Sequence, residues 1–281
     1  MPPIQSASAA DEPAPKESLW VQLRTLALFL LIALAVRTLI FQPYTIPSAS
    51  DEPNLYQGDY IIVSKWTYGF SRHSILGSPP LFAGRIFGRA PIRGDVIVFK
   101  LPRDGHTDYI KRLIGMPGDR VQVRHGQVFI NGETLGEGRP RSVTTEDRGW
   151  PEQARWVRET NVEGRTYLTQ IHGAGEEIAD NTGVYVVPPH CYFMMGDNRE
   201  NSLDSRFDPG VLSDSPKLGG CGWDPTLDAY LPPAVGVGFL PQDNLVGRAR
   251  IVLLSWKTNA SLFKPWTWLD LRPDRFLKPI R

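Results

Sequence analysis

Two serines stand two positions apart in a short loop that prolines stiffen, and they are the first candidates for covalent chemistry. The loop spans 46–59 and contains Ser48 and Ser50 between Pro47 and Pro53. Because proline fixes φ, a serine held in such a loop can be aimed at a substrate. A serine hydroxyl is a weak nucleophile until a base takes its proton. The sequence shows no G-x-S-x-G turn and no paired His/Asp arrangement, so another base is needed.

Lys111 is the best candidate for that base. It lies in the segment 108–115, where the run 109–114 predicts a strand, and alternation along a strand sends its side chain to the face opposite Ile110 and Arg112. A lysine acts as a base only when it is neutral near the working pH, which requires burial against apolar surface. The competing interpretation is a solvated lysine at the edge of a sheet.

A third polar cluster, at 195–206, directly follows an apolar run. It contains Ser202, Asp204 and Arg206. Taken alone, this pattern is typical of an Asx turn or a helix cap, which is the preferred interpretation of the cluster by itself.

The elements that must position these residues are short β-branched runs separated by turns. Gly and Pro number 26 and 25, a share that favours turns over helices. The expected fold class is mainly β, with twisted antiparallel sheets around a catalytic β domain and one N-terminal transmembrane helix. Polar, irregular insertions are expected near 70–92 and 140–180. The expected strands are 60–63, 96–99, 109–114, 121–123, 128–130, 184–187, 192–195 and 248–254.

One apolar stretch near the N-terminus is the membrane candidate. Thr25 to Phe41 is about 17 residues, roughly 26 Å as a helix, against a hydrocarbon core of about 30 Å. Arg24 and Arg37 can snorkel at its ends and extend its reach. The alternatives are a buried core helix and a signal peptide cleaved after Ala33-Leu34-Ala35.

The expected organisation is a cytoplasmic tail over 1–18, a transmembrane anchor over 19–42 and an extracytoplasmic catalytic domain over 43–281. The charges of the tail favour a cytoplasmic N-terminus only weakly. Aromatic residues near the C-terminus, among them Trp266 and Trp268, suit either a membrane interface or an ordinary core.

Composition narrows the function classes. The chain of 281 residues carries 31 basic and 30 acidic residues, so it lacks the positive charge typical of nucleic-acid binders. No Cys/His spacing suggests zinc, and we expect no metal and no cofactor. The two cysteines, Cys191 and Cys221, either close one loop as a disulfide or remain free thiols.

Taken together, the clusters resemble bacterial signal peptidase I, a family of membrane-bound Ser/Lys endopeptidases. The ordered set of motifs covers most of the chain, and long polar insertions resemble those of Gram-negative members. The segments that carry the resemblance are 47–50, 58–59, 64–65, 93–96, 109–112, 115–119, 196–206 and 245–249.

The resemblance implies a role for each site residue. Ser50 would attack the scissile carbonyl and Lys111 would take its proton. Ser48 would complete an oxyanion hole with the Ser50 backbone N–H, and Ser202 would hold the lysine amine. Asp204 and Arg206 would brace the site by pairing. The implied substrates are preproteins whose signal peptides have small residues at the first and third positions before the cut. The implied location is the periplasmic side of the bacterial inner membrane.

The nucleophile loop departs from the family at two positions. Members normally have methionine after the nucleophile and threonine after the next proline, whereas this chain has Asp51 and Asn54. A carboxylate that faced the site would oppose the developing oxyanion and favour the charged form of the lysine. Asp51 either faces the site in this way or points to solvent.

Two other functions compete with the peptidase. One is a catalytically impaired, membrane-anchored homologue that binds exported polypeptides. The other is a Ser/Lys enzyme of the penicillin-binding or β-lactamase type, because Ser261 to Lys264 spells S-x-x-K. No S-D-N or K-T-G motif accompanies it, so this alternative is set aside.

Overall fold

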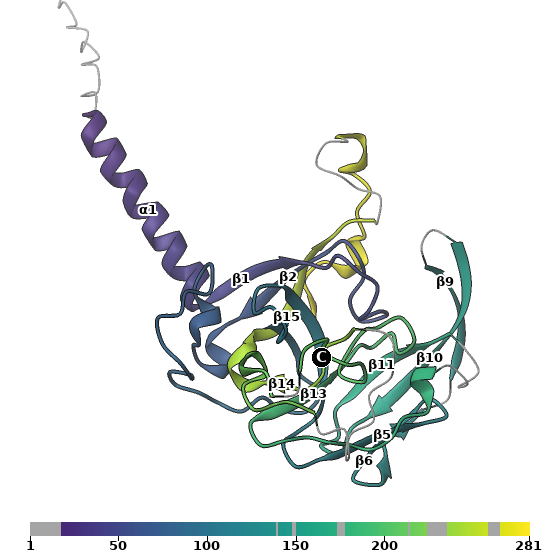
Figure 1. Cartoon of the computed structure of the whole chain (residues 1–281). Helices are drawn as coiled ribbons and strands as arrows, with labels where there is room; N and C mark the ends of the chain where they lie inside the picture. The colour runs from purple at the N-terminus through teal and green to yellow at the C-terminus, as the bar shows by residue number, and fades with distance from the viewer. Residues whose placement is uncertain are drawn as a thin grey trace, which may run out of the picture.

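The computed structural model describes residues 18–138, 140–147, 150–172, 178–212, 214–223, 235–257 and 265–281. The helix α1 (Leu19–Leu39) projects from a β body (Figure 1). Ser18 caps it by accepting a hydrogen bond from the Trp20 N–H, as N-cap serines do. At 21 residues the helix is about 31 Å long, enough to cross a bilayer. None of its residues is buried, so the core-helix alternative is wrong.

The β body is built from short strands joined by turns and 3-10 helices. The strands are β1 (Phe41–Thr45), β2 (Asp59–Ser64), β3 (Val96–Lys100), β4 (Asp108–Gly115), β5 (Arg120–Arg124), β6 (Gln127–Ile130), β7 (Glu133–Thr134), β8 (Gly136–Glu137), β9 (Arg141–Asp147), β10 (Trp150–Thr160), β11 (Thr166–Ile171), β12 (Tyr185–Val186), β13 (Cys191–Met195), β14 (Leu240–Pro241), β15 (Leu245–Ser255) and β16 (Lys278–Pro279). The 3-10 helices are η1 (Trp66–Tyr68), η2 (Arg72–Ser74), η3 (Ile178–Asp180), η4 (Pro216–Leu218), η5 (Gln242–Asn244), η6 (Pro265–Thr267) and η7 (Pro273–Arg275).

The largest sheet positions the chemistry. Its strand order is β1-β2-β15-β3-β4-β13-β14, with β16 paired to β15, and all its pairings are antiparallel. Strand β4 therefore lies between β3 and β13, with Lys111 opposite Ile97 of β3. Buried apolar residues such as Leu113 and Phe99 fill the core beside it. The mainly β prediction is confirmed, and each predicted strand overlaps an observed one.

The insertion at 140–180 differs from its prediction as an irregular segment. Its described residues form β9, β10 and β11, which pair antiparallel and lie to one side of the body in Figure 1. Polar side chains occupy much of this sheet. Apolar residues such as Ala154, Val157 and Leu168 do not recur at every second position along its strands. The period-2 apolar signal that identifies a half-buried strand is therefore weak here.

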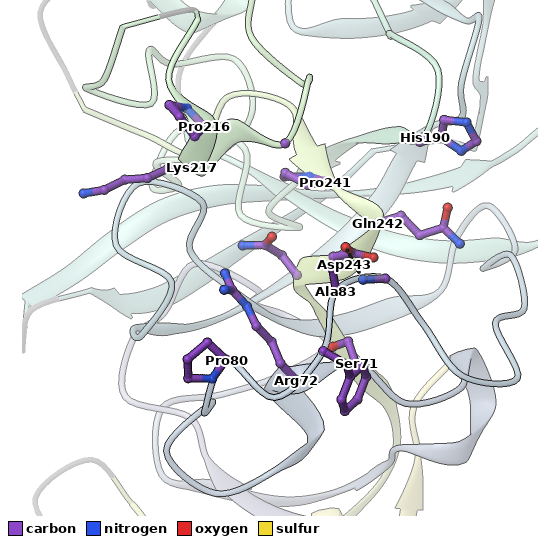
Figure 2. Close-up of a pocket in the computed structure, with 14 residues that line it drawn as sticks. Ser71, Arg72, Pro80, Ala83, His190, Pro216, Lys217, Pro241, Gln242 and Asp243 are labelled. Carbon is purple, nitrogen blue, oxygen red and sulfur yellow. Dashed lines mark hydrogen bonds between the residues drawn. The ribbon is translucent and has the colours of Figure 1, made fainter.

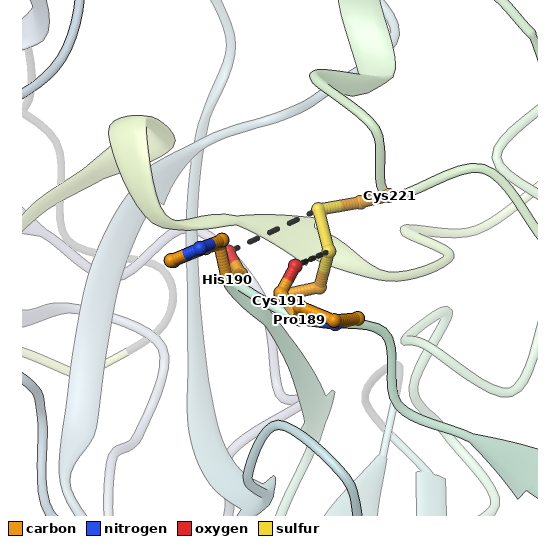
Figure 3. Close-up of a disulfide and its surroundings, with 4 residues drawn as sticks. All are labelled: Pro189, His190, Cys191 and Cys221. Carbon is orange, nitrogen blue, oxygen red and sulfur yellow. Dashed lines mark hydrogen bonds between the residues drawn. A yellow bond between two sulfur atoms is a disulfide. The ribbon is translucent and has the colours of Figure 1, made fainter.

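Cys191 and Cys221 form a disulfide, with a separation of 5.7 Å between their Cα atoms (Figure 3). The bond joins the start of β13 to the turn that follows η4. Both residues lie in the core cluster that contains Phe193 and Phe239. Of the two alternatives the sequence left open, the structure has the bridged pair.

Candidate active site

The loop that carries Ser50 connects β1 to β2 and is held at both ends. The Ile46 N–H donates to Asp59 O at 2.9 Å, and the Gly58 N–H donates to Ile46 O at 3.0 Å. Leu55 is fully buried in the core cluster beneath the loop. These contacts fix the loop on the sheet.

The third polar cluster, at 195–206, binds the backbone at Ser50 and at the residue before it. The Asn198 N–H donates to Ser50 O at 3.1 Å, and the Asn198 side-chain amide donates to Ala49 O at 3.2 Å. The 195–206 segment is thus more than a turn, because Asn198 binds the backbone of the loop that carries Ser50.

Lys111 reaches Ser50 from β4. Its Nζ lies 2.6 Å from Ser50 Oγ, and its side chain is 4% exposed. The same amine donates to Ile110 O at 2.8 Å. A nucleophile and a base are expected at about this separation, within hydrogen-bond reach of each other. The edge-residue interpretation of Lys111 is wrong, because β4 is an interior strand and the loop of Ser50 covers its lysine.

Ser48 and Ser202 lie near this pair in different ways. Ser48 Oγ is 3.4 Å from Ser50 Oγ, and Ser48 is an exposed residue that lines the cavity beside Ser50. Ser202 Oγ is buried and has no hydrogen-bond partner among the described residues. Gly196 lies between Ser50 and Ser202 and is packed closely against both. A Cβ added to it would lie 2.3 Å from Ser202 Oγ and 2.4 Å from Ser50 O. The structure therefore brings Ser202 beside Ser50 without a hydrogen bond to Lys111.

Asp204 and Arg206 pair as the resemblance implied. Arg206 Nε and Nη2 each lie 2.9 Å from a carboxylate oxygen of Asp204, and both residues are buried. Burial alone would raise the pKa of Asp204, but the Arg206 charge and the hydrogen bonds from Arg206 and the Gly196 N–H hold the pKa below its usual value. This pair fixes the backbone at Gly196, beside Ser50 and Ser202.

Asp51 faces the site and not the solvent. It is 2% exposed, and its Oδ2 accepts a hydrogen bond from Ser50 Oγ at 3.1 Å and lies 3.4 Å from Lys111 Nζ. Burial raises the pKa of Asp51 to about 6, the nearby Lys111 charge opposes that rise, and the Asp197 charge adds to it. Of the two orientations considered from the sequence, the one that meets the nucleophile is present.

Asn54, the second departure from the family pattern, ties the loop to two other segments of the chain. Its side-chain amide lies 2.7 Å from Asp197 Oδ2 and 2.6 Å from Leu168 O. Asp197 is in turn bound by Arg112, whose Nε and Nη2 each lie 2.7 Å from a carboxylate oxygen. Arg112 is fully buried and stacks over the Tyr167 ring at 4.1 Å.

Sequence reasoning assigned no individual role to Arg112, Asp197 or Asn198. Arg112 carried one usable signal, since a charged residue in an apolar strand must be paired when it is buried. Asp197 and Asn198 were recognised only as part of a motif. Asp197 is bound by Asn54, and Asn198 binds Ala49 O. Each partner lies more than a hundred residues away in the sequence, so no local pattern could reveal these contacts.

A cavity of about 620 Å³ opens beside the Ser50–Lys111 pair. Ile110 and Phe207 give part of its wall an apolar character, while Ser48, Ser202 and Lys111 supply polar atoms. The cavity is open on one side, so the arrangement suits acyl transfer on a polypeptide.

A second cavity, of about 650 Å³, lies elsewhere on the body. Figure 2 shows its lining, which comes from the 71–84 stretch, the 216–219 turn and the 241–244 stretch. It contains none of the site residues predicted from the sequence. We therefore place the candidate active site in the cavity beside Ser50.

Comparisons with known proteins match this geometry to a family. The family described as signal peptidase, peptidase S26, matches residues 19–256. The chain belongs to this family. The signal peptidase I of Rickettsia typhi is 34% identical over 248 residues, which cover 85% of this chain and 78% of that protein. The signal peptidase I of Rickettsia akari is 34% identical over 242 residues, covering 83% and 79%.

A crystal structure of a signal peptidase I from Enterococcus faecalis aligns with 57% of this chain and 97% of that chain, at 25% identity and a TM-score of 0.27. Membership of the signal peptidase family makes the chain a serine endopeptidase. The apolar helix α1 fits a membrane-anchored member of that family. The match begins at residue 19, where α1 begins. The S-x-x-K sequence at 261–264 lies outside the described residues.

Proposed function

We propose that the chain is a membrane-anchored endopeptidase that removes N-terminal signal peptides from exported preproteins, with Ser50 as nucleophile and Lys111 as general base. The observation that carries the proposal is the 2.6 Å contact between Lys111 Nζ and Ser50 Oγ at the wall of an open cavity. Its family relatives are named signal peptidase I.

The proposed reaction follows from the positions of these atoms. Neutral Lys111 takes the proton of Ser50 as Oγ attacks the scissile carbonyl, and a tetrahedral oxyanion forms. The Ser48 hydroxyl and the Ser50 backbone N–H stabilise the oxyanion, a type of contact for which one donor contributes about 2.7 to 4 kcal/mol. Lys111 then returns the proton to the leaving amine, and water releases the signal peptide from the acyl-enzyme. Ser202 lines the same cavity as the Lys111 amine. The Asp204–Arg206 pair holds Gly196 beside Ser202 through the hydrogen bond from the Gly196 N–H to Asp204.

The proposed substrates have small residues at the first and third positions before the cut. In an extended peptide these alternate side chains point to the same side. The apolar wall around Ile110 and Phe207 supports shallow pockets for them. The proposed location is the bacterial inner membrane, with a tail over 1–18, an anchor over 19–42 and residues 43–281 on the periplasmic side. The length of α1 supports a single crossing of lipid.

The test is cleavage of a preprotein by the detergent-solubilised full chain. Ser50→Ala and Lys111→Ala should each abolish cleavage. Ser142→Ala and Lys257→Ala remove the same residue types from exposed positions and should cleave like the wild type. Cleavage that survives either site substitution would exclude the proposed pair.

A second candidate is an impaired homologue that binds exported polypeptides without cutting them. The buried Asp51 carboxylate beside the nucleophile favours it, since negative charge there opposes an oxyanion. This candidate predicts preprotein binding to the wild type with no cleavage at any pH, and the same affinity for Ser50→Ala.

A further inference from the structure

Asp51 touches both members of the proposed catalytic pair. Its Oδ2 is 3.1 Å from Ser50 Oγ and 3.4 Å from Lys111 Nζ, and its side chain is 2% exposed. A carboxylate buried to this degree needs charge compensation or hydrogen bonds. Its Oδ1 is buried without a partner among the described residues, so compensation comes through Oδ2 from Ser50 and Lys111.

The contacts around Lys111 are those of a protonated amine. An ammonium has three N–H donors and no acceptor. Nζ has three acceptors within reach, which are Ser50 Oγ at 2.6 Å, Ile110 O at 2.8 Å and Asp51 Oδ2 at 3.4 Å. With Ser50 Oγ accepting from Nζ, its own hydroxyl proton is directed to Asp51. In this arrangement Lys111 has no lone pair to accept the proton of Ser50.

The charges that face Asp51 leave Lys111 as its direct ionic partner. Arg112, the next residue on β4, has its guanidinium bound to Asp197 by two hydrogen bonds. Asp197 itself is a second negative charge facing Asp51. Burial raises the pKa of Asp51 to about 6, and the nearby Lys111 charge opposes that rise and favours the ionised carboxylate. The Asp51 carboxylate and the Lys111 ammonium therefore form a buried ion pair at the nucleophile.

We propose that Asp51 locks the catalytic pair as a buried ion pair with Lys111, so that peptide cleavage begins only after Lys111 has given up one proton and can accept that of Ser50. This inference rests on the proposed function of Ser50 and Lys111. The unlocking step breaks one N–H bond of the ammonium and passes the proton to solvent through the open cavity. The hydroxyl proton of Ser50 then turns from Asp51 to the freed amine. The amine takes this proton as Oγ attacks the carbonyl carbon.

The test compares the pH profile of kcat/KM for preprotein cleavage in the full-length wild type and in Asp51→Asn. Asparagine keeps the shape and removes the charge. The rise of activity with pH should move to lower pH by about one to four units, the range for a unit charge 3.4 Å away between water-like and protein-surface dielectrics. At neutral pH this corresponds to a gain of roughly tenfold or more.

Two further variants make the result specific. Glu163→Gln removes a carboxylate that pairs with Arg93, and its profile should coincide with that of the wild type. Asp51→Met removes the charge with a different shape, so a shift in the same direction is expected if Asp51→Asn fails to fold.

An unchanged profile in the two Asp51 variants, or a loss of activity across the whole pH range in folded protein, would overturn the lock. The proposed function fails separately, through cleavage that survives Ser50→Ala or Lys111→Ala.

Discussion

Gly196→Ala should disable the site without removing any polar group. The new Cβ would lie 2.4 Å from Ser50 O and 2.3 Å from Ser202 Oγ, whereas ordinary contacts to carbon are about 3.5 Å. The Ser50 carbonyl is held by the Asn198 N–H at 3.1 Å and cannot turn aside alone. The nucleophile loop must therefore retreat by about 1 Å.

The magnitude follows from that displacement. A misplacement of about 1 Å between reacting groups costs roughly 100-fold in rate, about 2.7 kcal/mol of transition-state stabilisation. Overpacking should also lower the free energy of unfolding by about 1 to 3 kcal/mol. The assay is kcat/KM on a preprotein in detergent, with thermal unfolding of the same sample to show that the loss occurs in folded protein.

Gly136→Ala is the matched control. Its added Cβ would meet Thr160 Cβ at 3.6 Å, an ordinary contact, in a sheet away from the cavity. It should leave kcat/KM unchanged. Folded Gly196→Ala that keeps activity within about threefold of the wild type would refute the claim that this close approach sets the position of Ser50.

Three other outcomes are expected. Asp204→Asn should cost about 3 to 5 kcal/mol in chemical unfolding, because it leaves the Arg206 charge buried without its partner. Since the pKa of Asp204 is lowered in the fold, its stabilisation is present at neutral pH and lost as pH falls through the folded pKa, so the variant should show less acid sensitivity in the same assay. Cys191→Ser should lower stability by roughly 3 to 4 kcal/mol for a 30-residue separation, and a reductant should reproduce the effect in the wild type when melting is followed. Deletion of residues 1–39 should move the protein from the membrane pellet to the supernatant on fractionation, because it removes an apolar helix that is left uncovered by the described part of the fold.

The strands and the motif clusters could be predicted because their signals are local. The run 96–99 is wholly apolar and the run 109–114 is apolar apart from Lys111 and Arg112, and each lies within an observed strand. The sheet at 141–171 was missed because a long polar hairpin gives little periodic signal. Helix α1 lies within the segment 19–42 expected as the anchor, and it begins before the uncharged run that starts at Thr25.

The orientation of Asp51 could not be predicted for a different reason. Side-chain direction in a loop depends on what packs against it, and this loop is gripped by residues distant in sequence. Asn54 binds Asp197, and Arg275 donates to Asn54 O at 2.9 Å while pairing with Asp59. These long-range contacts place Ser50 over β4 and turn the adjacent carboxylate inward.

The register of β4 is part of the chemistry that we propose for the site. Lys111 and Arg112 are consecutive, so their side chains leave opposite faces of the strand, one toward Ser50 and the other toward Asp197. A slip of one residue would exchange the two faces. Ser50 would then meet a guanidinium, which cannot be deprotonated in proteins and so cannot act as a base. The pairing of Lys111 with Ile97 on β3 and of Arg112 with Met195 on β13 therefore selects which cation meets the nucleophile.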